Sequence, residues 1–262
     1  MKATSKSRFF QNILPILIAL VAVGITWHFL SSTPAGCYQK IFSIGSSLCH
    51  QIPSHGFQTN GIPFPVCARC SGLYLGSFIG LAYGFLSGKK TGLPKKEYLI
   101  LLAVLFFLWG LDGANSFISD FINHPFLHTT TNTTRLVTGF GMGLLMATAL
   151  ATLFNTTIWK DGENTAVLRH PLQVVVYTLL CGIISLLPIS NIPLLFTISA
   201  YIVIFTALGI ISLLYTIFWV IIFRKENSFP TWKSLWGMLT AGFSTAMLQV
   251  ILLNTLRSNL FL

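Results

Sequence analysis

Charged residues are scarce in this chain: they make up 8% of its 262 residues, and only six residues are acidic. A soluble domain carries about 25% charged residues, so the composition argues against a soluble globular protein. The chain is 53% hydrophobic, and apolar runs of about 20 residues, the length of a membrane-crossing helix, recur along it. Because lipid cannot satisfy free backbone groups, helices are the expected spanning elements. The sequence therefore predicts an all-α, polytopic membrane protein built as a helical bundle.

The motifs of several common enzyme and binding classes are missing. The sequence contains no nucleotide-binding glycine loop, no serine triad and no internal repeat. It also lacks a basic segment interleaved with aromatic residues, which argues against nucleic acid as a partner. The net charge of +10 has a simpler explanation. Most lysines and arginines lie in predicted loops, where they would face anionic lipid headgroups.

Seven apolar segments are candidate membrane spans. The first resembles a signal peptide, but Pro34 in the TPAGC sequence that follows disfavours cleavage and favours an uncleaved helix. Successive flanks of the spans contain 3, 2, 4, 1, 2, 0, 3 and 1 basic residues, starting with Lys2, Lys6 and Arg8. Because basic residues collect on the cytoplasmic side, this alternation predicts the N-terminus inside and the C-terminus outside. The spans cover residues 10–30, 66–88, 97–119, 134–155, 171–190, 194–222 and 234–256.

Most of the reactive side chains gather on the predicted outer side, around the sequences CHQIP and PVCARC. Cys67 and Cys70 follow prolines that favour a helix start, and their i, i+3 spacing puts both on one helix face. The helix dipole and the charge of Arg69 favour their thiolate forms. Together with Cys49 and His50 they make a Cys₃His set, which is typical of zinc. The sequence predicts a metal site with these four ligands.

Two other interpretations of the cysteines stay open. Cys37, Cys49, Cys67 and Cys70 are an even number of thiols on one face, which also suits structural or redox-active disulfides. Alternatively, the cysteines are unpaired and serve only in packing.

Three further residues are candidates for catalysis: Asp112, Arg135 and Arg69. Asp112 is the only acidic residue well inside a predicted span, where a carboxylate is costly and usually has a partner. Arg135 at the start of the next span is the predicted partner. Asp112 would act as a base or an anchor, and Arg135 would hold a carboxylate or phosphate. His124 and His128 have a spacing that suits one metal ion in a helix, although a solvated loop is the favoured interpretation.

Glycines recur at every fourth position of the second span and are frequent in the fourth. Small residues at this spacing allow two helices to approach closely. We therefore expect the second span to pack tightly against a neighbour, with the fourth span as its counterpart. The glycines are Gly72, Gly76, Gly80, Gly84 and Gly88 in the second span and Gly139, Gly141 and Gly143 in the fourth.

The motifs of this chain resemble those of the bacterial membrane proteins grouped as domain of unknown function 2085 (DUF2085). The resemblance covers residues 45–145 and implies a multi-spanning membrane protein. It also implies that three shared cysteines and a histidine form a metal site rather than a pair of disulfides. The motifs are CHQIP at 49–53, PVCARCSGLYLG at 65–76, LDG at 111–113 and NTTRLVTG at 132–139.

The resemblance divides the chain into three parts. Residues 1–44 would form an N-terminal helix and an outer loop, residues 45–145 the family-like domain, and residues 146–262 additional spans. A bacterial plasma membrane is the expected location, with the functional face extracytoplasmic.

The leading functional hypothesis is a membrane protein with a zinc site at the outer surface, acting on a lipid-linked or amphiphilic substrate. A complete Cys₃His set closes the coordination shell, so the ligands alone predict no catalysis. The first alternative is a thiol–disulfide oxidoreductase that uses Cys67 and Cys70 as the redox pair, Cys37 and Cys49 as the loop pair, and a quinone. The second alternative is a transporter. A zinc deaminase is disfavoured because Gln51, not glutamate, follows His50.

Overall fold

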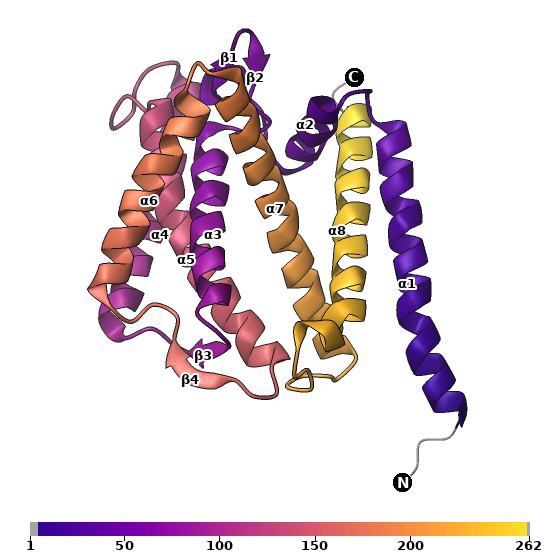
Figure 1. Cartoon of the computed structure of the whole chain (residues 1–262). Helices are drawn as coiled ribbons and strands as arrows, with labels where there is room; N and C mark the ends of the chain where they lie inside the picture. The colour runs from indigo at the N-terminus through magenta and orange to yellow at the C-terminus, as the bar shows by residue number, and fades with distance from the viewer. Residues whose placement is uncertain (1–4, 261–262) are drawn as a thin grey trace.

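Long apolar helices account for most of the computed structural model, which describes residues 5–260. Successive long helices run in opposite directions, so that α1 begins at one end of the bundle and α8 finishes at the other (Figure 1). α1 packs beside α8, whereas α3 lies in the middle of the bundle between α5 and α7. The helices of the described chain are α1 Ser5–Ser32, α2 Cys37–Leu48, α3 Ala68–Leu86, α4 Lys96–Ile122, α5 Asn132–Ile158, α6 Pro171–Ile189, α7 Pro193–Ile222 and α8 Trp232–Leu260.

Four very short strands and one 3₁₀ turn complete the described fold. β1 (Gln58–Thr59) and β2 (Ile62–Pro63) form an antiparallel hairpin, and η1 (Pro53–His55) precedes it. β3 (Lys90–Gly92) pairs in parallel with β4 (Glu163–Ala166) at the opposite end of the bundle (Figure 1). We call the end that carries α2 and the hairpin the cysteine end, and the end that carries β3 and β4 the lysine end. The predicted all-α class is confirmed.

Six of the described helices are long and apolar enough to cross a membrane: α1, α4, α5, α6, α7 and α8. They correspond to six of the seven predicted spans. The remaining predicted span, residues 66–88, corresponds to α3, which has 19 residues and carries Arg69 in its first turn. α3 is enclosed by neighbouring helices, whereas α1, α4 and α6 direct many large apolar side chains outward, as expected for surfaces that face lipid.

Basic residues are distributed unequally between the two ends of the bundle. Nine of the sixteen lie in or beside the three connections at the lysine end. This asymmetry agrees with a cytoplasmic lysine end, and the orientation in the membrane stays a prediction. Lys2, which contributed to the predicted topology, lies outside the described residues. The nine are Lys89, Lys90, Lys95, Lys96, Lys160, Arg169, Arg224, Lys225 and Lys233.

Glycines bring α3 and α5 into close contact, which confirms the predicted packing. A methyl group added to Gly80 would lie 2.5 Å from Cβ of Ala147, and one on Gly143 would lie 2.6 Å from the carbonyl oxygen of Leu73. Gly72 and Gly139 face each other across the same interface. Two predicted members do not belong to it: Gly141 contacts Leu105 of α4, and Gly88, with φ +101°, lies beyond the end of α3 in open space. The contact fixes the position of the N-terminus of α3 at the cysteine end.

Candidate metal centre

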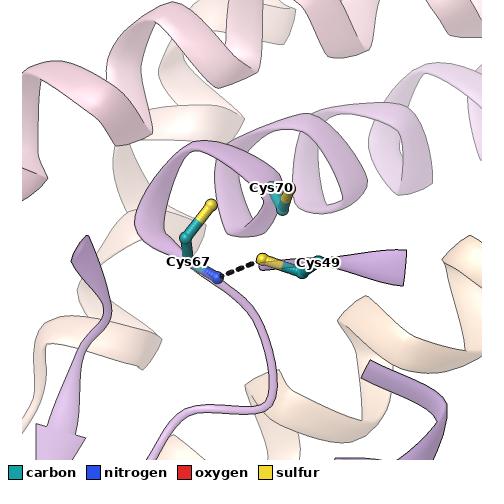
Figure 2. A group of neighbouring side chains, drawn as sticks. All are labelled: Cys49, Cys67 and Cys70. Carbon is teal, nitrogen blue, oxygen red and sulfur yellow. Dashed lines mark hydrogen bonds between the residues drawn. The ribbon is translucent and has the colours of Figure 1, made fainter. Parts of the chain in front are cut away.

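Three thiols meet at the cysteine end of the bundle. The sulfur atoms of Cys49, Cys67 and Cys70 all lie within 4.8 Å of one another (Figure 2). Cys49 and Cys67 are buried, and Cys70 is partly buried. The structure thus brings together the three cysteines that the sequence predicted as metal ligands, although 17 residues separate Cys49 from Cys67 along the chain.

The local structure around α3 explains how the thiols converge. Cys67 is the N-cap of α3, in an extended conformation, and Cys70 lies one turn further on. Cys49 follows the last residue of α2. The backbone N–H of Cys67 donates a hydrogen bond of 3.1 Å to the sulfur of Cys49 (Figure 2). A helix N-terminus favours negative charge, so this arrangement stabilises a thiolate.

The segment that carries Cys49 is held from two sides. Gln51 adopts the left-handed conformation, with φ 54°, and its side-chain amide donates to the carbonyl of Pro65 at 2.7 Å. From α8, the guanidinium of Arg257 donates to the carbonyls of Ser46 and Cys49, both at 2.7 Å, and to that of His50 at 3.1 Å. Arg257 entered the sequence-based prediction only as a charge in the C-terminal tail, because no local pattern links it to residues more than 200 positions earlier.

The electrostatics of the cluster favour one negative charge shared among three sulfurs. Cys67 lies at the N-terminus of α3, where unpaired backbone N–H groups and the helix dipole favour a thiolate. The hydrogen bond with Cys67 raises the pKa of Cys49 to about 11. A divalent cation would replace the remaining thiol protons. Zinc with Zn–S bonds of about 2.3 Å holds tetrahedral sulfur ligands about 3.8 Å apart, so small side-chain movements would suffice.

The predicted fourth ligand, His50, lies beside this cluster but is not part of it. Its Nδ1 atom accepts the backbone N–H of Ile52 at 3.0 Å, so in the neutral ring the hydrogen resides on Nε2. The ring packs edge-on against that of His55, with centroids 5.5 Å apart. In the described conformation His50 therefore presents no free lone pair to the thiols, and ligation would require the ring to turn.

The remaining cysteines lie apart from the cluster. Cys37 is exposed at the start of α2, and Cys49 follows the end of the same helix. At 1.5 Å per residue the two are about 18 Å apart, whereas a disulfide needs Cα atoms about 4.4–6.8 Å apart. Cys181 is buried within α6. This separation counts against Cys37 and Cys49 as a redox pair.

Asp112 pairs with Arg69, which corrects the predicted pairing with Arg135. Arg69 donates to Oδ2 of Asp112 through Nε at 2.9 Å and Nη2 at 2.5 Å, and to its backbone carbonyl at 3.0 Å. The hydroxyl of Thr138 adds a hydrogen bond of 3.3 Å to the same oxygen. Arg69, in the first turn of α3, reaches this carboxylate of α4, whereas the guanidinium of Arg135 on α5 binds Ser116 instead. The pair ties α3 to α4 beside the thiols.

Arg135 instead has neutral partners. Its guanidinium donates to the hydroxyl of Ser116 at 2.7 and 3.2 Å and to the side-chain oxygen of Asn132 at 2.9 Å. The residue is 6% exposed. No carboxylate of the described residues lies within 4 Å of it. Arg135 lines a pocket of about 510 Å³ at the cysteine end, between α4, the start of α5 and the loop that joins them.

His124 and His128 lie in that loop, which is not helical, and both side chains line the pocket. They do not join a group of metal-ligating side chains within the described chain, where the three cysteines are the group found. Asp120, also at the pocket, contacts the buried His55 at 3.2 Å. Burial, followed by the charge of Arg135, lowers the pKa of His55. Asp120 was not among the functional residues predicted from the sequence, and no role was predicted for His55.

Comparisons with known proteins agree with the membrane character of the fold. A family model described as predicted membrane protein (DUF2085) matches residues 49–149, the segment that holds all three clustered cysteines. An uncharacterized protein of Methanocaldococcus jannaschii is 30% identical over 138 residues, which are 51% of this chain and 76% of the relative. An uncharacterized protein of Methanothermobacter thermautotrophicus is 34% identical over 100 residues, 38% of this chain and 81% of the relative.

Both relatives come from archaea, so the comparisons support a membrane protein but not the bacterial membrane expected from the sequence. No solved structure matches this chain.

Proposed function

The chain belongs to the DUF2085 family of predicted membrane proteins, and from this premise we propose that it binds a zinc-like cation through Cys49, Cys67 and Cys70. The observation that carries the proposal is the convergence of three sulfur atoms within 4.8 Å of one another at the N-terminus of α3. Thiolate ligands select zinc and other soft cations over magnesium or calcium. The backbone N–H that reaches the sulfur of Cys49 is an outer-shell contact of the kind that orients and stabilises a metal ligand.

The burial of the thiols favours a structural role for this ion. Cys49 is 8% exposed and Cys67 is 3% exposed, and none of the three cysteines lines the pocket beside Arg135. The ion would tie the segment after α2 to the start of α3. Arg257 would extend this connection to α8, since it binds the carbonyls of Cys49 and His50. The fourth coordination position would face His50, which lies beside the cluster.

The location of the site supports action on an amphiphilic or lipid-linked molecule. In the orientation predicted from the basic residues, the cysteine end faces the extracytoplasmic side, at the level of the lipid headgroups. The pocket of about 510 Å³ lies at the same end, and its size suits a ligand larger than a single ion. In this proposal the metal and the Arg69–Asp112 pair fix the helices that form the pocket, and Arg135 contacts an acidic group of the ligand.

A thiol–disulfide oxidoreductase is the second candidate, because thiols this close together also suit disulfide exchange. In its favour, Cys67 lies at the N-terminus of α3, where the helix dipole promotes the reactive thiolate. Against it, Cys37 and Cys49 lie at opposite ends of α2 and cannot form the loop pair that the scheme requires.

Metal analysis combined with thiol counting tests the proposal. Purified protein should contain about one zinc ion per chain, and the clustered thiols should resist alkylation until a chelator is added. Serine at Cys49, Cys67 or Cys70 should remove the metal, because each change leaves an incomplete shell. Cys37→Ser, a matched change outside the cluster, should retain it.

The opposite pattern would favour the oxidoreductase. A metal-free protein whose clustered cysteines become available only after reduction would refute the metal proposal. His50→Ala distinguishes two forms of the site: loss of zinc would assign the fourth position to His50, and retention would leave this position to water or another ligand.

A further inference from the structure

Arg135 is a buried cation whose charge has no partner among the described residues. Its neighbours Ser116 and Asn132 are neutral, and the nearby Asp112 is already bound by Arg69. A guanidinium carries five N–H groups, and three hydrogen bonds to protein atoms leave two of them free. Burying a charge without a counter-charge is costly. Because Arg135 lines a pocket and its charge is unpaired, its guanidinium is suited to bind an anion from outside the chain.

Two hydroxyl groups of the pocket also have unused donors. The hydroxyl of Ser119 accepts the backbone N–H of Phe126 at 3.0 Å, and the hydroxyl of Thr130 accepts the side-chain amide of Asn115 at 2.7 Å. Within the described chain neither hydroxyl donates a hydrogen bond to the protein. Both residues line the same pocket as Arg135. The pocket thus offers hydrogen-bond donors from α4, from α5 and from the loop between them.

The other titratable groups around the pocket are compatible with an anion. Asp120, the acidic residue that lines it, is half exposed and is bound to the buried His55. His128 lines the pocket and lies 3.9 Å from Oδ1 of Asp112, a buried oxygen with no hydrogen-bond partner.

We propose that this pocket binds the phosphate group of an amphiphilic ligand, with Arg135 as its main contact and Ser119 and Thr130 as further donors. The inference rests on the proposed function and names the chemical class of its ligand. Arginine favours phosphate because the planar guanidinium binds two oxygens at once. The cavity of about 510 Å³ is large enough for a headgroup rather than an isolated ion. At the end of a membrane bundle, phosphate is the anion that lipids themselves carry.

Calorimetric titration of delipidated protein in a neutral detergent tests the proposal. The probes are inorganic phosphate, a water-soluble short-chain phosphatidic acid and the corresponding diacylglycerol, which lacks the phosphate. Phosphatidic acid should bind, and Arg135→Gln should weaken it by at least about tenfold, since hydrogen bonds between charged groups are the stronger ones. Lys40→Gln removes a cation at the same end but outside the pocket, and should leave binding unchanged.

Ser119→Ala is a second test variant for use if Arg135→Gln fails to fold. It should weaken the binding of phosphatidic acid several-fold. Tighter binding of phosphatidic acid than of inorganic phosphate supports a lipid source, and equal affinity supports free phosphate at the same site. Equal binding of diacylglycerol, binding that survives Arg135→Gln, or no binding of either phosphate compound would overturn the inference. Zinc content measured on the same samples reports separately on the cysteine cluster, so the two proposals can fail independently.

Discussion

The substitution Gly143→Ala tests the close contact between α3 and α5. The added methyl carbon would lie 2.6 Å from the carbonyl oxygen of Leu73, 2.8 Å from the nitrogen of Ser77 and 3.0 Å from the carbonyl carbon of Gly76. Ordinary contacts of this kind are 3.4–4 Å. All three neighbours are main-chain atoms, which cannot rotate away as a side chain would. The two helices would have to separate by nearly an ångström.

The expected cost follows from the two effects of the new methyl group. Overpacking of a well-packed contact lowers the free energy of unfolding by about 1–3 kcal/mol. Replacing glycine by alanine inside a helix raises it by up to about 1 kcal/mol. We expect a net loss of about 1–2 kcal/mol. For a protein of this size that corresponds to a Tm lower by about 2–8 °C.

Thermal unfolding in detergent, followed by tryptophan fluorescence, measures the effect. Gly182→Ala on α6 and Gly110→Ala on α4 are matched controls, since a methyl group at either position meets nothing within 4 Å. Both controls should keep or slightly raise Tm. A Tm for Gly143→Ala equal to that of the two controls would refute the packing argument.

Three further predictions concern topology, an ion pair and pH. A reporter fused after Lys90 should be cytoplasmic and one fused near residue 125 external, and the reverse labelling would contradict an extracytoplasmic cysteine end. Arg69→Met and Asp112→Asn should each lower the free energy of unfolding by about 3–5 kcal/mol, because each leaves a buried charge without its partner. The double variant should lose less than the sum of the two single losses. Additive losses in this double-mutant cycle would argue against coupling between the two residues. The pKa of His55 is lowered, mainly by burial, so its contribution to stability is present above the unfolded value of about 6.5 and is lost as the pH falls below it. His55→Gln should reduce the drop in Tm between pH 7 and pH 5, and an unchanged pH profile would exclude this explanation.

Local patterns in the sequence predicted the features that depend on neighbours along the chain. Apolar runs identified every long helix, and the spacing of Cys67 and Cys70 put both thiols at one helix start. The glycine repeat identified the face of α3 that contacts α5. Each of these features depends on helical periodicity alone, because residues three or four apart share one face wherever the helix lies.

The partners of Asp112, Arg135 and Cys49 were decided only by the tertiary structure. Which arginine reaches Asp112 depends on how α3, α4 and α5 are rotated about their axes, and main-chain packing at the glycines sets this rotation between α3 and α5. The contact of Arg257 with Cys49 joins residues 208 positions apart, a distance over which no periodic pattern carries information. The composition thus determined that the chain folds as membrane helices and supplied the thiols. The three-dimensional packing brought these thiols together and left Arg135 facing a pocket with no counter-charge from the described residues, because contacts between distant segments depend on the geometry of the whole bundle.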